Sequence, residues 1–236
     1  MQRKHELELL DNNTLDAAKL HGNLQDIARL NRWTGTTAAV VRAIEAMAAH
    51  NLNPLVVIDI GTGAGDLPTA LVKRATREGL PLRVMGADVH AGVLDYARLH
   101  GSATDWLRLE ATHLPLASQS IDVAVCTVMA HHLEPEQLLS FITEMQRVSR
   151  IGFILMDLER SRLAWIALWL LTRLTSRNPL TRHDGPLSIE RAYKRTEILD
   201  LAASAGVSLQ VLPLFPFRWI AIWRARYAAP GDKSAG

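Results

Sequence analysis

The stretch Leu55-Val56-Val57-Ile58-Asp59-Ile60-Gly61-Thr62-Gly63-Ala64-Gly65-Asp66 decides the fold of this chain. Its first six residues are mostly apolar and β-branched, which is typical of a buried strand, and three alternating glycines follow. After Pro68 the apolar residues take a helical spacing, from Thr69 to Ala75. A strand, a tight turn and a helix are the opening unit of a parallel α/β sheet. The glycines allow a sharp turn and let a ligand approach the backbone.

The glycine spacing indicates which ligand this turn binds. A dinucleotide site needs G-x-G-x-x-G, which would place a glycine at position 66, where Asp66 stands. Asp66 and Asp59 favour a ligand that carries an amino or sulfonium cation over one that carries phosphates. The stretch resembles motif I of the class I S-adenosylmethionine-dependent methyltransferases, hh(D/E)hGxGxG, at every position. The resemblance implies that S-adenosylmethionine contacts Asp59, Gly61, Thr62, Gly63, Gly65 and Asp66.

Further landmarks of that family follow in order. Residues 81–88 predict a second strand ending at Asp88, whose carboxylate can accept hydrogen bonds from both hydroxyls of a ribose. Such an acid would serve an NAD enzyme equally well, but no Tyr-x-x-x-Lys or other hydride-transfer constellation is visible. Residues 106–110 predict a third strand, and residues 112–125 resemble the family's LPF-x-x-x-SFD-hh signature, which runs into a fourth strand at 121–126. The resemblance adds these cofactor contacts: Val89 beside Asp88, Glu110 to the adenine amine, the Ala111 N–H to the adenine ring, and Thr127.

Two histidines after the fourth strand are candidate catalytic residues. His131 and His132 lie where the carboxyl ends of the strands meet, and imidazole can remove a proton from an attacking hydroxyl near neutral pH. Asp157, at the end of a fifth strand at 151–158, is a further candidate base. The alternatives are that a histidine only shapes the pocket and that Asp157 caps the next helix.

Residues 1–50 predict an N-terminal helical cap before the methyltransferase domain of residues 51–236. Within the cap, Arg32 is a candidate partner for the carboxylate of the cofactor, and Trp33 for the substrate pocket. A surface arginine and a core tryptophan are the alternatives. Together with the later landmarks, the pattern predicts a Rossmann-like, doubly wound α/β sheet of seven mostly parallel strands with an antiparallel last strand.

A helical insertion is expected at about 160–192. Residues 163–174 are almost wholly apolar, but twelve residues make a helix of only about 18 Å, too short to span a bilayer. The segment therefore packs on the domain, walls a pocket for an apolar substrate, or lies in a membrane interface. Residues 183–186 predict a turn-rich loop between helices, and 207–212 and 219–223 predict the last strands. His183 and Arg195 are candidates to reach the acceptor.

Composition and charge limit the number of domains, the class of binding partner and the compartment of the protein. The 236 residues are 48% hydrophobic and 21% charged, which is typical of one soluble globular domain. From Arg160 to the end the net charge is +7, against −5 for the rest, which suits an anionic substrate, a membrane surface or nucleic acid. The single cysteine, Cys126, suits a reducing compartment, and no apolar signal segment opens the chain. We therefore expect a cytoplasmic protein, with contact to the inner face of the membrane left open.

The expected reaction is S-adenosylmethionine-dependent O- or C-methylation of a small, fairly apolar acceptor such as a phenol, enol, quinone precursor or polyketide. One alternative is an RNA or DNA methyltransferase, but residues 127–130 lack the Asn/Asp-Pro-Pro-(Tyr/Phe) motif of amino-methylating enzymes. A non-catalytic module that binds S-adenosylmethionine is the other. No metal site is predicted, because no metal-spaced His/Cys cluster is visible, and the oligomeric state is left open.

Overall fold

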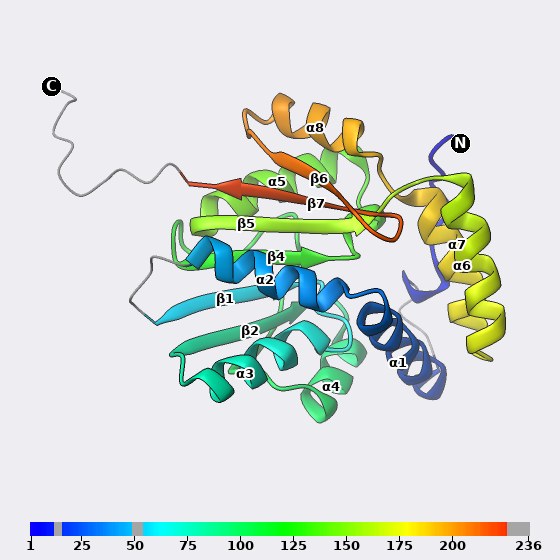
Figure 1. Cartoon of the computed structure of the whole chain (residues 1–236), viewed down its shortest axis with the longest axis horizontal. Coiled ribbons are helices and arrows are strands. Elements are labelled where there is room, and N and C mark those ends of the chain that lie inside the picture. Colours follow the sequence, from blue (N-terminus) through cyan, green and yellow to red (C-terminus); the bar gives the residue numbers. More distant parts are fainter. Residues whose placement is uncertain (12–15, 49–53, 226–236) are drawn as a thin grey trace, which may run out of the picture.

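The computed structural model describes residues 1–11, 16–48 and 54–225. Within these residues one sheet of seven strands runs in the order β3-β2-β1-β4-β5-β7-β6 (Figure 1). The strands are β1 Leu55–Ile60, β2 Leu82–Asp88, β3 Asp105–Arg108, β4 Ile121–Thr127, β5 Ser149–Leu158, β6 Gln210–Leu214 and β7 Arg218–Arg224.

The first five strands are parallel, and β7 is antiparallel to both of its neighbours, β5 and β6. This confirms the predicted Rossmann-like sheet with an antiparallel finish. The register fixes the position of the site. Ile60 lies opposite Ala87 of β2 and Cys126 of β4, so the glycine turn, Asp88 and Thr127 all emerge at one edge of the sheet.

Helices cover both faces of the sheet. On one face, α2 (Thr36–Ala48) and α3 (Asp66–Glu78) pack apolar residues such as Ile44 and Leu71 against Val57 of β1. On the other face, α5 (Pro135–Val148) and α8 (Arg195–Ser204) pack Phe141 and Ile198 against the same sheet. Because both faces are covered, the central strands are continuously apolar rather than alternating.

A second group of helices lies beyond the carboxyl ends of the parallel strands (Figure 1). It comprises α1 (Ala17–Trp33), α6 (Arg162–Thr175) and α7 (Pro179–Arg191), with the short helices η1 (Leu9–Asp11) and η2 (Ala130–His132) beneath them. The helix α4 (Ala91–His100) packs between α1 and the β2–β3 edge. This group roofs the site. Of the segment expected to be an N-terminal cap, α1 belongs to the roof, whereas α2 is part of the layer on the sheet.

The prediction of a turn-rich loop at 183–186 is wrong, because α7 runs through it as a helix with Pro186 inside. Tertiary contacts outweigh the local signal of the turn residues. Asp184 is buried and accepts hydrogen bonds from the backbone N–H groups of Leu9 and Leu10. A Cβ at Gly185 would lie 2.9 Å from Thr172 Cγ2, so glycine allows α6 and α7 to pack closely.

The other element boundaries shift by a few residues. Helix α3 starts at Asp66 rather than at Thr69, because Pro68 is tolerated in a first helical turn. The limits of β6 and β7 lie within two residues of the expected ones, except that β6 starts at Gln210 instead of residue 207. The expected boundary between the helical cap and the methyltransferase domain, at residues 50 and 51, lies outside the described residues. In the described part of the chain, no helix is long and apolar enough to cross a membrane.

Candidate active site

A cavity of about 620 Å³ opens at the carboxyl edge of the parallel strands. Its floor is the glycine turn after β1 together with the ends of β2 and β4, and its roof is formed by α1, α6 and α7. A segment at the start of the chain, which ends in η1, closes one side. A ligand crevice at this edge is what a doubly wound sheet provides.

The glycine turn has the conformation that the sequence predicted. Gly61, Gly63 and Gly65 all have positive φ values, of 72°, 53° and 72°. A Cβ at Gly61 would lie 2.7 Å from Met129 Cγ, whereas one at Gly63 would meet nothing within 4 Å. Gly63 also lines the cavity, so its missing side chain leaves space for a ligand next to the backbone.

Three carboxylates surround this turn. Asp88 accepts hydrogen bonds from the N–H groups of Gly63, at 3.2 Å, and His90, at 3.1 Å, which fixes its carboxylate beside the glycines. Asp66 accepts from Thr37 Oγ1 and Asn31 Nδ2, and Asp59 accepts from Thr62 Oγ1. None of the three forms an ion pair with a side chain in the described ranges.

Burial disfavours the ionised form of these three carboxylates. It raises the pKa of Asp59 to about 7, an effect that the Thr62 hydrogen bond opposes and the charges of Asp66 and Asp88 reinforce. Burial also raises the pKa of Asp66 and of Asp88. Asp59 Oδ1 is buried and has no hydrogen-bond partner among the described residues. A ligand that brings a sulfonium and an ammonium group fits this turn, because it supplies the missing positive charge, and pyrophosphate does not.

Most of the other residues expected at the cofactor also lie on the cavity wall. Thr62, Asp66, Asp88, Val89, Glu110, Ala111 and Thr127 all line it. Asp59 lies directly behind Thr62 and is buried, so it acts on the cavity through its charge and that hydroxyl. Glu110 is exposed, and its carboxylate accepts a hydrogen bond from Thr112 Oγ1 at 3.0 Å.

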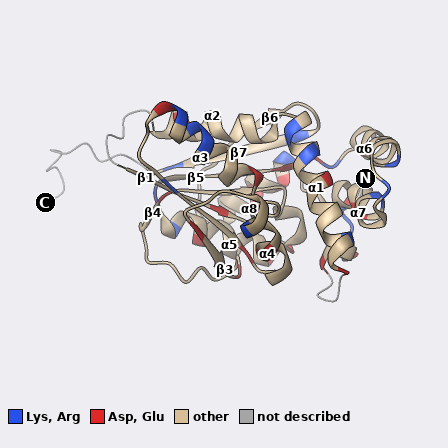
Figure 2. Ribbon diagram, turned by 90° about the horizontal axis from the view of Figure 1, so that it is seen from below, with Lys and Arg blue, Asp and Glu red and all other residues tan. Residues whose placement is uncertain are grey.

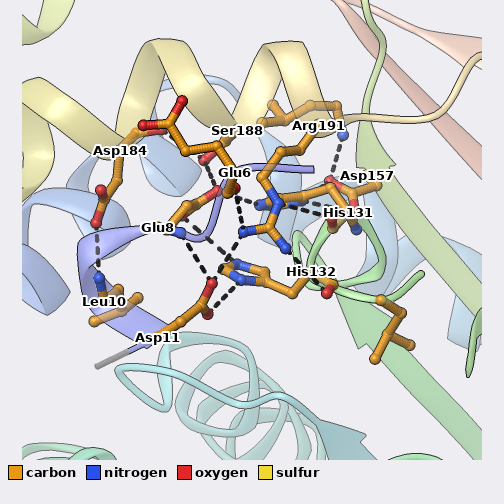
Figure 3. Close-up of polar contacts among 12 residues, drawn as sticks. Glu6, Glu8, Leu10, Asp11, His131, His132, Asp157, Asp184, Ser188 and Arg191 are labelled. Atoms are coloured by element: carbon orange, nitrogen blue, oxygen red, sulfur yellow. Dashed lines mark hydrogen bonds and ion pairs between the residues drawn. The ribbon is translucent and has the colours of Figure 1, made fainter. Parts of the chain in front are cut away.

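At the other end of the cavity the two histidines have different surroundings (Figure 3). His131 is 1% exposed, and its Nδ1 lies 2.9 Å from Asp157 Oδ1 while its Nε2 lies 3.4 Å from Glu8 Oε1. Burial alone would lower the pKa of His131, but the charges and hydrogen bonds of Asp157 and Glu8 outweigh it and raise the pKa to about 10. His131 is therefore a poor base, because its proton is held between two carboxylates.

His132 is the more accessible of the two, and its ring also lines the cavity. Its Nδ1 lies 2.8 Å from Asp11 Oδ1. Arg191 fixes this arrangement, since its guanidinium donates to Asp11 Oδ2 and to the backbone oxygens of His131 and His132 (Figure 3). His132 is thus oriented by a carboxylate, with Nε2 pointing away from it.

Besides Asp59, six of the expected site residues do not line the cavity: Arg32, Trp33, Gly65, Asp157, His183 and Arg195. Asp157 is buried beneath it, where its carboxylate accepts from His131 and from the Leu158 N–H, so it positions His131 and is no base. Arg32 and Trp33 are exposed at the end of α1, which points them to solvent rather than inward. Arg195 pairs with Glu159 at 3.0 Å outside the cavity.

His183 is also outside the cavity wall, where it contacts Asp184 at 2.8 Å. Its expected place at the acceptor depended on a loop at 183–186, and the helix α7 turns it outward. Sequence reasoning also missed Glu8, Asp11 and Arg191. Glu8 and Asp11 lie in the segment expected to belong to the helical cap, and Arg191 lies in the helix expected after the loop at 183–186. Only the acidic run Glu6, Glu8 and Asp11 could have drawn attention to the first two.

Comparisons with known proteins agree with this geometry. Residues 57–152 match the profile of a family described as "Methyltransferase domain". A malonyl-[acyl-carrier protein] O-methyltransferase of Yersinia pestis is 33% identical over 129 residues, which are 55% of this chain and 43% of that protein. The match thus spans less than half the length of this curated relative.

Solved structures show the same fold at low identity. An S-adenosylmethionine-dependent methyltransferase of Aquifex aeolicus has a TM-score of 0.60 and 18% identity, covering 89% of this chain and 98% of that one. The magnesium protoporphyrin IX methyltransferase of Synechocystis PCC 6803, solved with bound S-adenosylhomocysteine, has a TM-score of 0.58 and 20% identity, covering 85% and 87%. Together with the glycine turn, these matches show that residues 57–152 are similar to a methyltransferase domain and that the chain has the fold of S-adenosylmethionine-dependent methyltransferases.

Proposed function

We propose that this chain transfers a methyl group from S-adenosylmethionine to an oxygen or carbon atom of a small, largely apolar acceptor. The observation that carries the proposal is the division of one cavity into two ends. At one end, three carboxylates that have no ion-pair partner among the described residues surround the glycine turn, and apolar helix faces line the other end. S-adenosylmethionine bound at the glycine turn would supply the activated methyl group at the point where the two ends of the cavity meet.

The acceptor end is built mainly by α6. Ala164, Leu168 and Leu171 line the cavity from this helix, and Ile189 of α7 continues the apolar wall. Arg218 contributes a positive charge, and its Nε is buried without a hydrogen-bond partner among the described residues. These contacts favour an apolar molecule with one acidic oxygen, such as a phenol, an enol, a quinone precursor or a polyketide.

Catalysis would rest mainly on alignment. Methyl transfer from a sulfonium needs the acceptor atom, the methyl carbon and the sulfur in line, and holding two reactants in such geometry can contribute up to about 7–11 kcal/mol. The acceptor also loses a proton. Of the predicted bases, His132 is the most accessible, and it lies on the cavity wall oriented by Asp11, so it is the residue proposed to contact the acceptor.

The test is a methyl-transfer screen of the full chain with labelled S-adenosylmethionine. Phenols, quinols, pyrones and free and carrier-bound carboxylic acids form the acceptor panel; the last class is included because a relative is named as acting on malonyl-acyl-carrier protein. We expect label in at least one apolar acceptor. Transfer to RNA or DNA alone would favour the nucleic-acid alternative, and cofactor binding without transfer to any acceptor would favour the non-catalytic module.

We also propose that α6 contacts an anionic membrane surface. Its outward side carries Leu163, Ile166, Leu170 and Leu174, which are 47–82% exposed and recur at helical spacing. Figure 2 shows α6 beyond one end of the sheet with basic residues on it, and Arg162, Arg173 and Arg177 are exposed along this helix and just after it.

Sedimentation with phosphatidylglycerol vesicles tests this contact and should capture the chain. Ile166→Asp should weaken the capture, because it places a charge in the middle of the exposed apolar side of α6. Equal binding to neutral vesicles, or capture that Ile166→Asp leaves unchanged, would contradict the proposal.

A further inference from the structure

Three potential metal-ligand atoms meet on the wall of the acceptor end of the cavity. One ring nitrogen of His131, one ring nitrogen of His132 and a carboxylate oxygen of Glu8 all lie within 4.8 Å of one another (Figure 3). Glu8 Oε1 is 3.4 Å from His131 Nε2, and Glu8 Oε2 is 3.8 Å from His132 Nε2. Two ligands bound to one zinc ion at bond lengths near 2.1 Å in tetrahedral geometry would be about 3.4 Å apart. The distances from the Glu8 oxygens to the two imidazoles are therefore close to the distance between two ligand atoms of one bound metal ion.

The outer nitrogen of each imidazole is also arranged as in a metal site. His131 Nδ1 lies against Asp157, and His132 Nδ1 lies 2.8 Å from Asp11. With Nδ1–H donating to a carboxylate, Nε2 is the ring atom that faces Glu8 in both histidines, and a metal ion bound there would replace the Nε2 proton of His131. Histidine ligands of protein-bound metals commonly donate their other N–H to a carboxylate, which fixes the ring and raises its basicity.

The cluster is anchored on every side. Glu8 is buried and accepts a hydrogen bond from Ser188 Oγ at 2.8 Å, which holds the carboxylate toward the histidines. Arg191 is 1% exposed and binds Asp11 together with the backbone of both histidines. The ligand atoms therefore come from two segments far apart in sequence, the start of the chain and the loop after β4, and they are held by α7 and β5.

From this geometry we propose that Glu8, His131 and His132 bind a divalent transition-metal ion, with Asp11 and Asp157 as the carboxylates that orient the two imidazoles. Two imidazoles and one carboxylate suit Zn²⁺, Fe²⁺, Mn²⁺ or Co²⁺, and three protein ligands leave coordination positions open. All three residues line the cavity, so a ligand in the cavity could fill an open position.

The role of the ion rests on the function proposed above. An acceptor oxygen that binds the metal would be held near the transferable methyl group, and its proton would pass to solvent more readily because the ion stabilises the resulting oxyanion. In that arrangement His132 is a metal ligand rather than a free base. The ion would also favour acceptors with two neighbouring oxygens, such as catechols or β-dicarbonyl enols.

The experiment measures metal binding on the full chain, apart from any methyl transfer. Chain stripped with a chelator is titrated with Co²⁺ and Zn²⁺, and the readouts are the visible absorption of bound Co²⁺ and calorimetric stoichiometry. We expect one ion per chain and a further shift of the Co²⁺ spectrum on addition of catechol. Glu8→Gln and His132→Asn should weaken binding at least 100-fold, and Asp11→Asn about 10- to 100-fold.

Two control variants match these changes. Glu6→Gln lies in the same segment but is exposed, and His113→Asn removes an exposed imidazole, so both should bind Co²⁺ as the unaltered chain does. Circular dichroism and S-adenosylmethionine binding show whether each variant is folded. The proposal is overturned if the unaltered chain binds no Co²⁺ or Zn²⁺, or if folded Glu8→Gln binds them unchanged. If no acceptor is methylated in the screen, the proposed function is wrong, but the Co²⁺ spectrum of the chain does not change. The two proposals can therefore be tested separately.

Discussion

His131 Nδ1 lies 2.9 Å from Asp157 Oδ1, and both side chains are almost completely buried. Asp157 also accepts a hydrogen bond from the His131 backbone N–H, so one carboxylate at the end of β5 holds the loop that follows β4. The loop in turn carries His132 and the oxygens that Arg191 binds. This pair therefore joins the sheet to the wall of the acceptor end, and it has consequences for stability.

Asp157→Asn is expected to destabilise the chain by about 3 kcal/mol, because it removes one of the two carboxylates that compensate the buried charge of His131 and leaves only Glu8. Urea unfolding measures the change. Asp105→Asn serves as control, since Asp105 pairs with Arg83 at the surface and should contribute at most about 1 kcal/mol. A loss for Asp157→Asn no larger than for the control would mean that the pair is not structural.

Gly63→Ala should reduce the affinity for S-adenosylmethionine at least 10-fold, because the new Cβ would project into the cavity beside the cofactor. Gly79→Ala is the matched control. Gly79 also has a positive φ, of 66°, and open space around a Cβ, but it ends α3 away from the cavity. Both variants carry the same backbone strain, so a difference in calorimetric affinity isolates the contact with the cofactor. Equal affinities would place the cofactor elsewhere.

The stability of the ligand-free chain should fall as the pH rises from about 5 to 8. Since burial raises the pKa of Asp59 to about 7, the folded state retains a proton that the unfolded state has lost above its ordinary pKa near 4. The difference is expected to be on the order of 1 to 4 kcal/mol. In Asp59→Asn the dependence should be smaller, with part remaining from Asp66 and Asp88. The measurement is the unfolding midpoint at several pH values in this range. A pH dependence of that midpoint that is the same in Asp59→Asn as in the unaltered chain would contradict the assignment of the raised pKa to Asp59.

Leu168→Trp should raise the KM for the acceptor several-fold while leaving S-adenosylmethionine affinity unchanged, because Leu168 lines the acceptor end from α6. Leu170→Trp makes the same exchange on the outward side of the helix, where the residue is 47% exposed, and should alter neither value. Steady-state kinetics with the acceptor found in the screen compare the two. Similar effects of both variants would indicate a general change in α6 rather than a smaller cavity.

The strands and the glycine turn could be predicted because their signals are local. A β-branched run before Gly61, Gly63 and Gly65 leaves few backbone choices, and the acids at the ends of two strands must meet at one edge of a parallel sheet. These features carried the sheet architecture, which is confirmed. The match of residues 57–152 to a methyltransferase domain agrees with the family resemblance and with S-adenosylmethionine as the cofactor.

The acceptor end could not be predicted in the same way, because it is built by tertiary contacts. Asp184 and Pro186 are turn residues by composition, yet packing against α6 and bonds to the start of the chain hold them in a helix. Arg191 is charged and was not expected in the interior, where it binds the segment that brings Asp11 to the site. Conversely, Arg32 was a candidate for the cofactor carboxylate and Trp33 for the substrate pocket, but both are exposed at the end of α1.

The central claim is that the part of the cavity lined by Gly63 and Asp88 binds S-adenosylmethionine and not a nicotinamide dinucleotide. Calorimetric titration of the full chain with S-adenosylmethionine, repeated in the presence of excess NAD, tests it most directly. The account predicts saturable binding of one S-adenosylmethionine per chain with an affinity that NAD does not change and that Asp88→Ala lowers at least 10-fold. Saturable NAD binding that displaces S-adenosylmethionine, or binding that is indifferent to Asp88→Ala, would contradict it.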